Sequence, residues 1–151
     1  MIIRKATLED LEDLARLMRE YDVYENKLNK KVQISSIKEN KKLISKHIKS
    51  KSITHTVFEK DGKIVGLINW DIRSDNKAKK GVIHNLIIDK DYRGKKIGTK
   101  LVDYVIKEFK KRGCTKVGSF VRIANKGALE FWKKQGFDNN EAGYSISKRL
   151  K

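Results

Sequence analysis

The residues best suited to chemistry form a short basic turn between an apolar run and a helical pattern. The apolar run Leu86–Ile88 ends at Asp89, and the turn Arg93–Thr99 then brings one Arg, two Lys and two Gly together. Backbone N–H groups at a helix start lack intrahelical partners, and with the helix dipole they attract anions. Glycines let a ligand approach the backbone closely. The spacing therefore predicts a site for a phosphate or pyrophosphate group.

The turn differs from two better-known phosphate-binding loops. Three residues separate Gly94 from Gly98, where a P-loop has four, and Thr99-Lys100 reverses the P-loop order of Lys and Ser/Thr. The G-x-G-x-x-G pattern of dinucleotide-binding folds is also missing. From spacing alone, an ordinary basic turn between a strand and a helix remains an open alternative.

Length and composition limit the class of protein. A chain of 151 residues is expected to form one domain, residues 1–151. No apolar run of about 18 residues is present, so we expect no membrane span. One cysteine, Cys114, excludes an internal disulfide and fits a reducing cytoplasm, which is the expected location. With three widely spaced histidines beside that single Cys, no metal site is expected.

The formal net charge of +17 has three explanations that the sequence leaves open. It fits contact with nucleic acid or the ribosome, attraction of acidic ligands, or a lysine-rich composition with no specific partner. The Lys and Arg residues are spread along the whole chain, which favours the last explanation.

Hydrophobic periodicity predicts the elements that must position the turn. A polar link is expected at 22–27, after the first helix. Strands are expected at 2–6, 54–59, 63–72, 81–88, 115–121, 137–138 and 144–150, and helices at 8–21, 34–48, 99–111 and from Asn125 to Gly136. The order β-α-α-β-β-β-α-β-α-β-β indicates an α/β (α+β) fold with a mainly antiparallel sheet.

Two stretches resemble motifs of the GNAT superfamily of N-acetyltransferases. Residues Ile83–Leu101 resemble its acetyl-CoA motif, Arg/Gln-x-x-Gly-x-Gly/Ala, and Asn125–Phe137 resembles its block Asn-x-x-Ala-x-x-Phe-Tyr-x-x-x-Gly-Phe. The order of elements resembles the family fold as well. The resemblance implies a central mixed sheet of about six or seven strands flanked by about four helices. It also implies acetyl-CoA as cosubstrate, no metal, and direct acetyl transfer to a primary amine.

The resemblance also implies roles for single residues. The backbone of Leu86, Ile87 and Ile88 would pair with the pantetheine arm as if it were a further strand. Asn125 would bind the same arm, although it could also simply cap a helix. The pyrophosphate would lie on the backbone amides of the turn, which are those of Arg93, Gly94, Lys95, Lys96, Ile97, Gly98 and Thr99.

Two positions depart from the family pattern. Lys96 replaces the first glycine of the motif, which is acceptable if its φ is negative. Trp132 replaces the tyrosine whose phenol often protonates the departing thiolate, and an indole N–H is not a usable acid. Tyr144 or water is the substitute to consider. A thiol pKa near 8.5 lets the thiolate leave largely unprotonated in any case.

The remaining catalytic roles follow from the same resemblance. The backbone N–H of Ile88 is expected to polarise the thioester carbonyl. The family often places a Glu on the central strand as base, but residues 79–88 hold no acid, so His84 is the candidate base. Its alternative is an ordinary packed histidine.

The acceptor would be a small-molecule amine or a peptide N-terminus. Its expected site combines the polar link with the last hairpin, where the chain is locally acidic, although these can also be ordinary turn residues. The candidates are Asp22, Tyr24, Glu25, Asn26, Asp138, Asn139, Asn140 and Glu141. A catalytically weak acetyl-CoA-binding module and a basic RNA- or ribosome-associated protein remain alternatives, as do a monomer and a homodimer.

Overall fold

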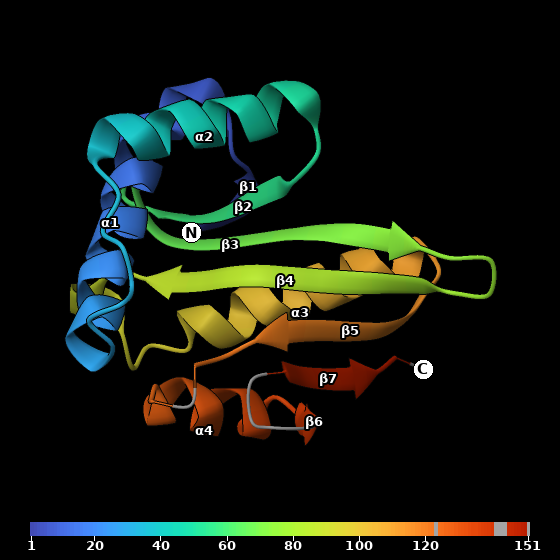
Figure 1. Ribbon diagram of the computed structural model, residues 1–151. Helices are drawn as coiled ribbons and strands as arrows, with labels where there is room; N and C mark the ends of the chain where they lie inside the picture. Colours follow the sequence, from blue (N-terminus) through green and yellow to red (C-terminus); the bar gives the residue numbers. More distant parts are fainter. Residues whose placement is uncertain (123, 141–144, 151) are drawn as a thin grey trace.

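Seven strands form one mixed sheet in the computed structural model, which describes residues 1–122, 124–140 and 145–150 (Figure 1). Their spatial order is β1-β2-β3-β4-β5-β7-β6, and every pair is antiparallel except β4 with β5. This confirms the predicted fold class. The strands are β1 (Ile2–Lys5), β2 (Thr54–Lys60), β3 (Lys63–Ser74), β4 (Lys79–Ile88), β5 (Cys114–Phe120), β6 (Asp138–Asn140) and β7 (Ser145–Arg149).

Four α-helices flank the sheet, as predicted. They are α1 (Leu11–Leu28), α2 (Ile37–Ser50), α3 (Ile97–Lys111) and α4 (Lys126–Lys134), with short 3-10 turns η1 (Leu8–Asp10) and η2 (Lys90–Tyr92). In Figure 1, α2 lies over the β1–β2 side, α1 runs along one end of the sheet, and α3 lies behind β4. α1 packs against β4 at its Ile87 end, and the near face of the rest of β4 and of β5 has no helix over it in this view.

The predicted polar link at 22–27 is wrong, because α1 continues to Leu28. The polar side chain of Glu25 has partners within the fold and is buried, so polarity here does not mark the end of the helix. The second helix begins at Ile37 rather than at residue 34. Ser36 caps it by accepting a hydrogen bond from the backbone N–H of Glu39 at 3.1 Å.

The sheet buries apolar side chains on both faces. On the α3 face, Trp70 and Phe109 meet edge to face with ring centroids 5.1 Å apart. A Cβ on Gly81 would lie 2.6 Å from the Phe109 ring, so glycine is what allows α3 to pack this close to β4. On the other face, Leu14 of α1 and Ile44 of α2 pack against the sheet.

Two histidine side chains contact each other between α2 and β2. His47 Nδ1 of α2 lies 3.1 Å from His55 Nε2 of β2. Burial, followed by the charges of His47 and His84, lowers the pKa of His55 to about 4. Burial, followed by the charges of His84 and Lys46, also lowers the pKa of His47. Both rings are therefore neutral at pH 7.

The buried His55 makes folding sensitive to acid. The unfolded chain takes up this proton near pH 6.5, whereas the folded chain takes it up only near pH 4. Stability is therefore complete above pH 6.5 and is lost as the pH falls below it, by about 2 kcal/mol between pH 7 and pH 5 from His55 alone. Urea denaturation at the two pH values measures this loss. His55→Gln should remove most of it, and an equal loss in the variant would contradict the assignment.

Candidate active site

The parallel pairing between β4 and β5 stops partway along β4. Residues 79–83 of β4 pair with β5, and the last pair is Ile83 with Ser119. The Ser119 hydroxyl donates a hydrogen bond of 2.8 Å to the Ile83 carbonyl, which satisfies the backbone at the point where the ladder ends. In Figure 1, β4 continues well past the end of β5. Residues 84–88 therefore present one strand edge that no described strand pairs.

The register of β4 decides which backbone groups this edge offers. The Asp89 N–H donates to the Val65 carbonyl of β3 at 2.9 Å. Backbone groups alternate along a strand, so those of Ile87 also face β3, while those of Leu86 and Ile88 face the free edge. The Ile87 side chain is buried in the core as well. Of the three strand residues predicted to bind pantetheine, Leu86 and Ile88 face the free edge and Ile87 does not. The Ile88 carbonyl accepts a hydrogen bond from Arg93 Nε at 3.2 Å, so its N–H is the group left open to a ligand.

A β-bulge lies where the free edge begins. Asn69 of β3 pairs with Asn85, and Trp70 pairs with Ile83, so His84 is the extra residue. The Asn69 side-chain oxygen accepts a 2.7 Å hydrogen bond from the Asn85 N–H, which compensates for the disturbed ladder. Bulges redirect side chains and are common beside active sites. Sequence reasoning singled out His84 but missed the bulge.

Asp71 is a further residue that sequence reasoning missed. It lies on β3, and its Oδ2 is 3.3 Å from His84 Nε2. Carboxylates were sought only on β4 itself, where none occurs between Lys79 and Ile88. The hairpin register places Asp71 opposite Val82, so aligning the two strands would have brought it near His84.

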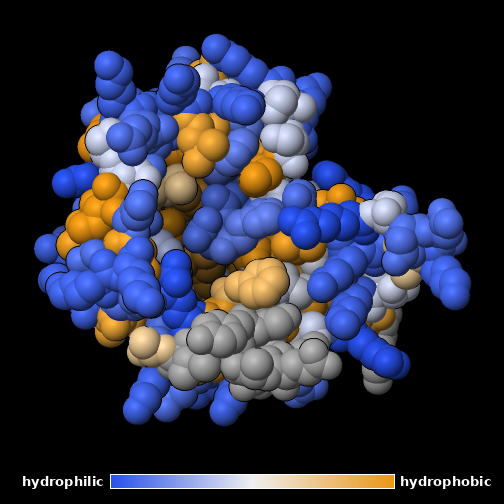
Figure 2. Space-filling model, in the orientation of Figure 1, coloured by the Kyte–Doolittle hydropathy of each residue, from blue (hydrophilic) through white to orange (hydrophobic). Residues whose placement is uncertain are grey.

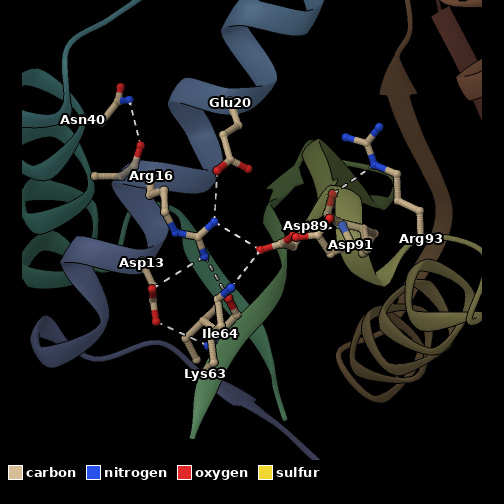
Figure 3. A network of polar contacts seen from close by, with 11 residues as sticks. Asp13, Arg16, Glu20, Asn40, Lys63, Ile64, Asp89, Asp91 and Arg93 are labelled. Atoms are coloured by element: carbon tan, nitrogen blue, oxygen red, sulfur yellow. Dashed lines mark hydrogen bonds and ion pairs between the residues drawn. The ribbon is translucent and has the colours of Figure 1, made fainter. Parts of the chain in front are cut away.

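A buried carboxylate fixes the chain as it leaves β4 (Figure 3). Asp89 is 3% exposed and accepts from Arg16 Nη1 at 3.1 Å and from the Asp91 N–H at 3.1 Å, with Lys63 Nζ 3.4 Å away. Burial raises the pKa of Asp89, but these hydrogen bonds and cations outweigh it, so the pKa lies below 3.8. The start of the basic turn is thus anchored to α1 and β3.

The turn that follows has two residues in the left-handed region. Gly94 has φ +75°, and Lys96 has φ +62°. The condition under which Lys96 would be an acceptable replacement, a negative φ, is therefore not met. The positive φ explains why the family has glycine at this position. The helix α3 begins at Ile97 rather than at residue 99, directly after Lys96. Ile97 is buried, so it offers only its backbone to a ligand.

The start of α3 is suited to an anion. Its N-cap is Lys96, whose side chain makes no capping hydrogen bond. A lysine has no acceptor atom for the first N–H groups of a helix, so the groups at Ile97, Gly98 and Thr99 lack the usual side-chain partner. Lys90 of η2 and Arg93 of the turn lie opposite α1. They line a cavity of about 370 Å³ together with Arg16, Arg19, Glu20, Val23, Tyr24, Lys27 and Ile37.

Cations outnumber carboxylates in this cavity, since only Glu20 is acidic. Arg16 is paired with Glu20 and Asp89, and the Arg93 guanidinium lies over the Tyr24 ring at 5.8 Å. Figure 2 shows the face in view hollowed beneath α2, with apolar atoms deep in the hollow and hydrophilic residues around it. The surroundings of the turn therefore favour an acidic ligand.

Asn125 links the helix α4 to α1. Its side-chain oxygen accepts from the Ala128 N–H at 3.1 Å, which confirms the helix cap, and its amide donates to Glu25 at 3.1 Å. Arg122 Nε lies 3.2 Å from the other oxygen of Glu25. Burial and the hydrogen bond to Glu25 raise the pKa of Tyr21. Because both ends of the Asn125 amide are used, its predicted contact with a cofactor would have to compete with these bonds.

The other predicted site residues are placed as follows. Trp132 is 5% exposed and packs against the rings of Phe131 and Phe137, so its side chain belongs to the core. Asp22 accepts from the Ser35 N–H, and Asn26 donates to the Val32 carbonyl, so both brace the α1–α2 connection. Tyr144 and Glu141 lie outside the described residues, as do the side chains of Asn139 and Asn140. Asp138 is exposed.

The described residues form neither a metal cluster nor a membrane-spanning helix. Within residues 1–122, 124–140 and 145–150, no group of three or more His, Cys, Asp or Glu side chains is arranged to hold a metal ion. No helix in that part of the chain has the length and apolarity needed to cross a membrane.

The conformation of Lys96 gives a test of the turn. A left-handed conformation costs a non-glycine residue about 1–2 kcal/mol, and a glycine loses about 0.5–1 kcal/mol more on folding. Lys96→Gly should therefore stabilise the fold by about 0.5–1 kcal/mol in urea denaturation. Lys95 has no positive φ, so the matched variant Lys95→Gly should destabilise instead. Equal effects of the two variants would refute the left-handed turn.

Comparisons with known proteins agree with this geometry. The family model described as "Acetyltransferase (GNAT) family" matches residues 11–137. An uncharacterised N-acetyltransferase of Methanocaldococcus jannaschii is 42% identical over 89 residues, which cover 56% of this chain and 39% of that protein. The N-alpha-acetyltransferase MAK3 of Arabidopsis thaliana is 36% identical over 76 residues, covering 50% of this chain and 40% of the relative. The match thus spans about two fifths of each relative.

Solved structures share the fold along nearly the whole chain. The PaiA N-acetyltransferase of Thermoplasma acidophilum, in complex with coenzyme A, superposes with a TM-score of 0.82 at 24% identity, covering 99% of this chain and 98% of that one. The ribosomal-protein-alanine N-acetyltransferase of Brucella melitensis has a TM-score of 0.75 at 18% identity, covering 99% and 100%. Because the family model matches most of this chain, the chain belongs to the GNAT acetyltransferase family.

Proposed function

We propose that this protein transfers the acetyl group of acetyl-CoA directly to a primary amine. The observation that carries the proposal is a free strand edge that leads straight into an uncapped helix start. The amide-rich pantetheine arm can pair with the backbone of Leu86 and Ile88, and the pyrophosphate can lie on the amides at the start of α3. Family membership supports the same cosubstrate, and PaiA was solved with coenzyme A.

The chain's own groups can carry the transfer. The Ile88 N–H faces the free edge and polarises the thioester carbonyl, so that the oxyanion formed by amine attack is stabilised. His84 lies at the start of the same edge and accepts the proton of the amine, directly or through a water molecule. The C–S bond then breaks, and its electron pair leaves with sulfur as the thiolate. No phenol is required at Trp132, because a thiolate leaves readily without protonation.

The acceptor is best sought among amines of low pKa. Making a lysine side chain neutral at pH 7 costs about 4–5 kcal/mol, whereas an α-amine costs about 1 kcal/mol. A histidine base suits the second case better. The names of the Arabidopsis and Brucella proteins, an N-alpha-acetyltransferase and a ribosomal-protein-alanine N-acetyltransferase, support a peptide or protein N-terminus as acceptor. A small-molecule amine of similar pKa remains the second acceptor class.

A thiol-release assay tests the activity and the acceptor together. Acetyl-CoA is supplied with three acceptors: a peptide with a free N-terminus, the same peptide with that terminus blocked and a lysine exposed, and a panel of small amines. We expect thiol release with the free N-terminus or with a small amine of low pKa. Release with the lysine peptide alone would contradict the acceptor class. No release with any acceptor, despite binding of acetyl-CoA, would contradict the activity.

A charge reversal separates cofactor binding from folding. Lys100 lies exposed in the first turn of α3. An acidic side chain there is stabilised by the helix dipole but repels a pyrophosphate. Lys100→Glu should leave stability unchanged or slightly higher and weaken acetyl-CoA binding about fivefold or more in calorimetric titration. Lys107→Glu, exposed in the C-terminal half of the same helix, is the control and should bind normally. Equal binding by both variants would place the pyrophosphate elsewhere.

A further inference from the structure

The chain holds three histidines, and the charge of His84 acts on the other two. His47 lies on α2, His55 on β2 and His84 at the β4 bulge. The rings of His47 and His55 are hydrogen-bonded to each other. His84 instead has the Asp71 carboxylate 3.3 Å from its Nε2. It is the histidine nearest to an anion among these three.

The two nitrogens of the His84 ring have different surroundings. Nε2 is shielded from solvent and has no partner that meets hydrogen-bond geometry among the described residues, while 27% of the side chain remains exposed. The exposed part therefore lies elsewhere on the ring. A carboxylate beside a shielded ring nitrogen favours a proton on that nitrogen, because the proton is then attracted to the negative charge. The lone pair of a neutral ring then lies on the other nitrogen, Nδ1.

We propose that Asp71 is a positioning residue that holds the His84 proton on Nε2 and so presents Nδ1 as the base for the acceptor amine. This inference rests on the proposed function. The proton of the attacking amine passes to Nδ1 as the C–N bond forms, and the imidazolium is stabilised by Asp71. The C–S bond breaks with its electrons on sulfur, and His84 returns the proton to solvent.

The neighbouring charges are compatible with this role. On β3, Arg73 Nε lies 3.7 Å from Asp71 Oδ1 and is largely exposed, so it leaves Oδ2 to His84. On α2 and β2, burial lowers the pKa of both His47 and His55, so neither ring adds a positive charge near His84 at pH 7. Lys46 of α2 acts on His47. Asp71 is thus the negative group in contact with the His84 ring.

The bulge explains why the His84 side chain can reach Asp71. In a regular ladder, neighbouring residues on a strand alternate between faces, so Ile83 and Asn85 would lie on one face and His84 on the other. The extra residue breaks this alternation, and Asn69 and Asn85 hold the break through a 2.7 Å hydrogen bond. His84 can then approach Asp71, which lies two residues beyond Asn69 on β3.

Asp71→Asn tests the inference, with Asp75→Asn as the matched control in an exposed turn of the same hairpin. We expect Asp71→Asn to lower kcat about tenfold or more with little change in the KM for acetyl-CoA. Asp75→Asn should match the wild type in both. A rise in the KM for acetyl-CoA with kcat unchanged would show a merely structural role and overturn the proposal.

A second measurement does not depend on activity. Nitrogen chemical shifts of the His84 ring report which nitrogen carries the proton in the neutral protein at pH 8. We expect the proton on Nε2 in the wild type and in Asp75→Asn, and a mixture in Asp71→Asn. A proton on Nδ1 in the wild type overturns the inference even if the enzyme is active. Absence of thiol release with the proton on Nε2 would instead count against the proposed function and leave the Asp71–His84 contact standing.

Discussion

The end of the β4–β5 ladder at Ile83 is the constraint on which the rest of the site depends. Up to that residue, β4 is an ordinary interior strand with partners on both sides. Beyond it, one edge has no described partner strand, and such a strand edge is a template for a ligand with alternating amide groups. The Ser119 hydroxyl makes this ending possible without leaving the last carbonyl unsatisfied.

Two further features lie at the two ends of the free edge. The bulge at His84 begins the edge and turns a titratable side chain toward Asp71. At the other end, Asp89 binds Arg16, Lys63 and the Asp91 N–H, which fixes the direction in which the chain leaves the sheet. A buried carboxylate with several donors is costly to disturb, so the turn that leads to α3 begins from a rigid point. The proposed base, the free edge and the proposed anion site thus follow one another along β4 and the turn after it.

The fold and the basic turn could be predicted from the sequence because both depend on residues that are close together in the chain. The order of elements follows from hydrophobic periodicity, and the glycines and lysines of the turn are adjacent in the chain. The extension of α1 was missed because Glu25 is polar yet buried against Asn125, a partner about one hundred positions away. Asp71 was missed for the same kind of reason, since its contact with His84 depends on strand register. The positive φ of Lys96 was missed because lysine gives no local sign of it.

In the proposed complex, one ligand spans the free edge of β4 and the start of α3. Backbone amide chemical shifts of the ¹⁵N-labelled protein, followed during titration with acetyl-CoA, test it most directly. We expect the largest changes at Leu86, Ile88 and the amides from Arg93 to Thr99, with Ile87 less affected and the outer face of α2 unchanged. Binding that moves only the lysine-rich face of α2, or no change at millimolar acetyl-CoA, would contradict it.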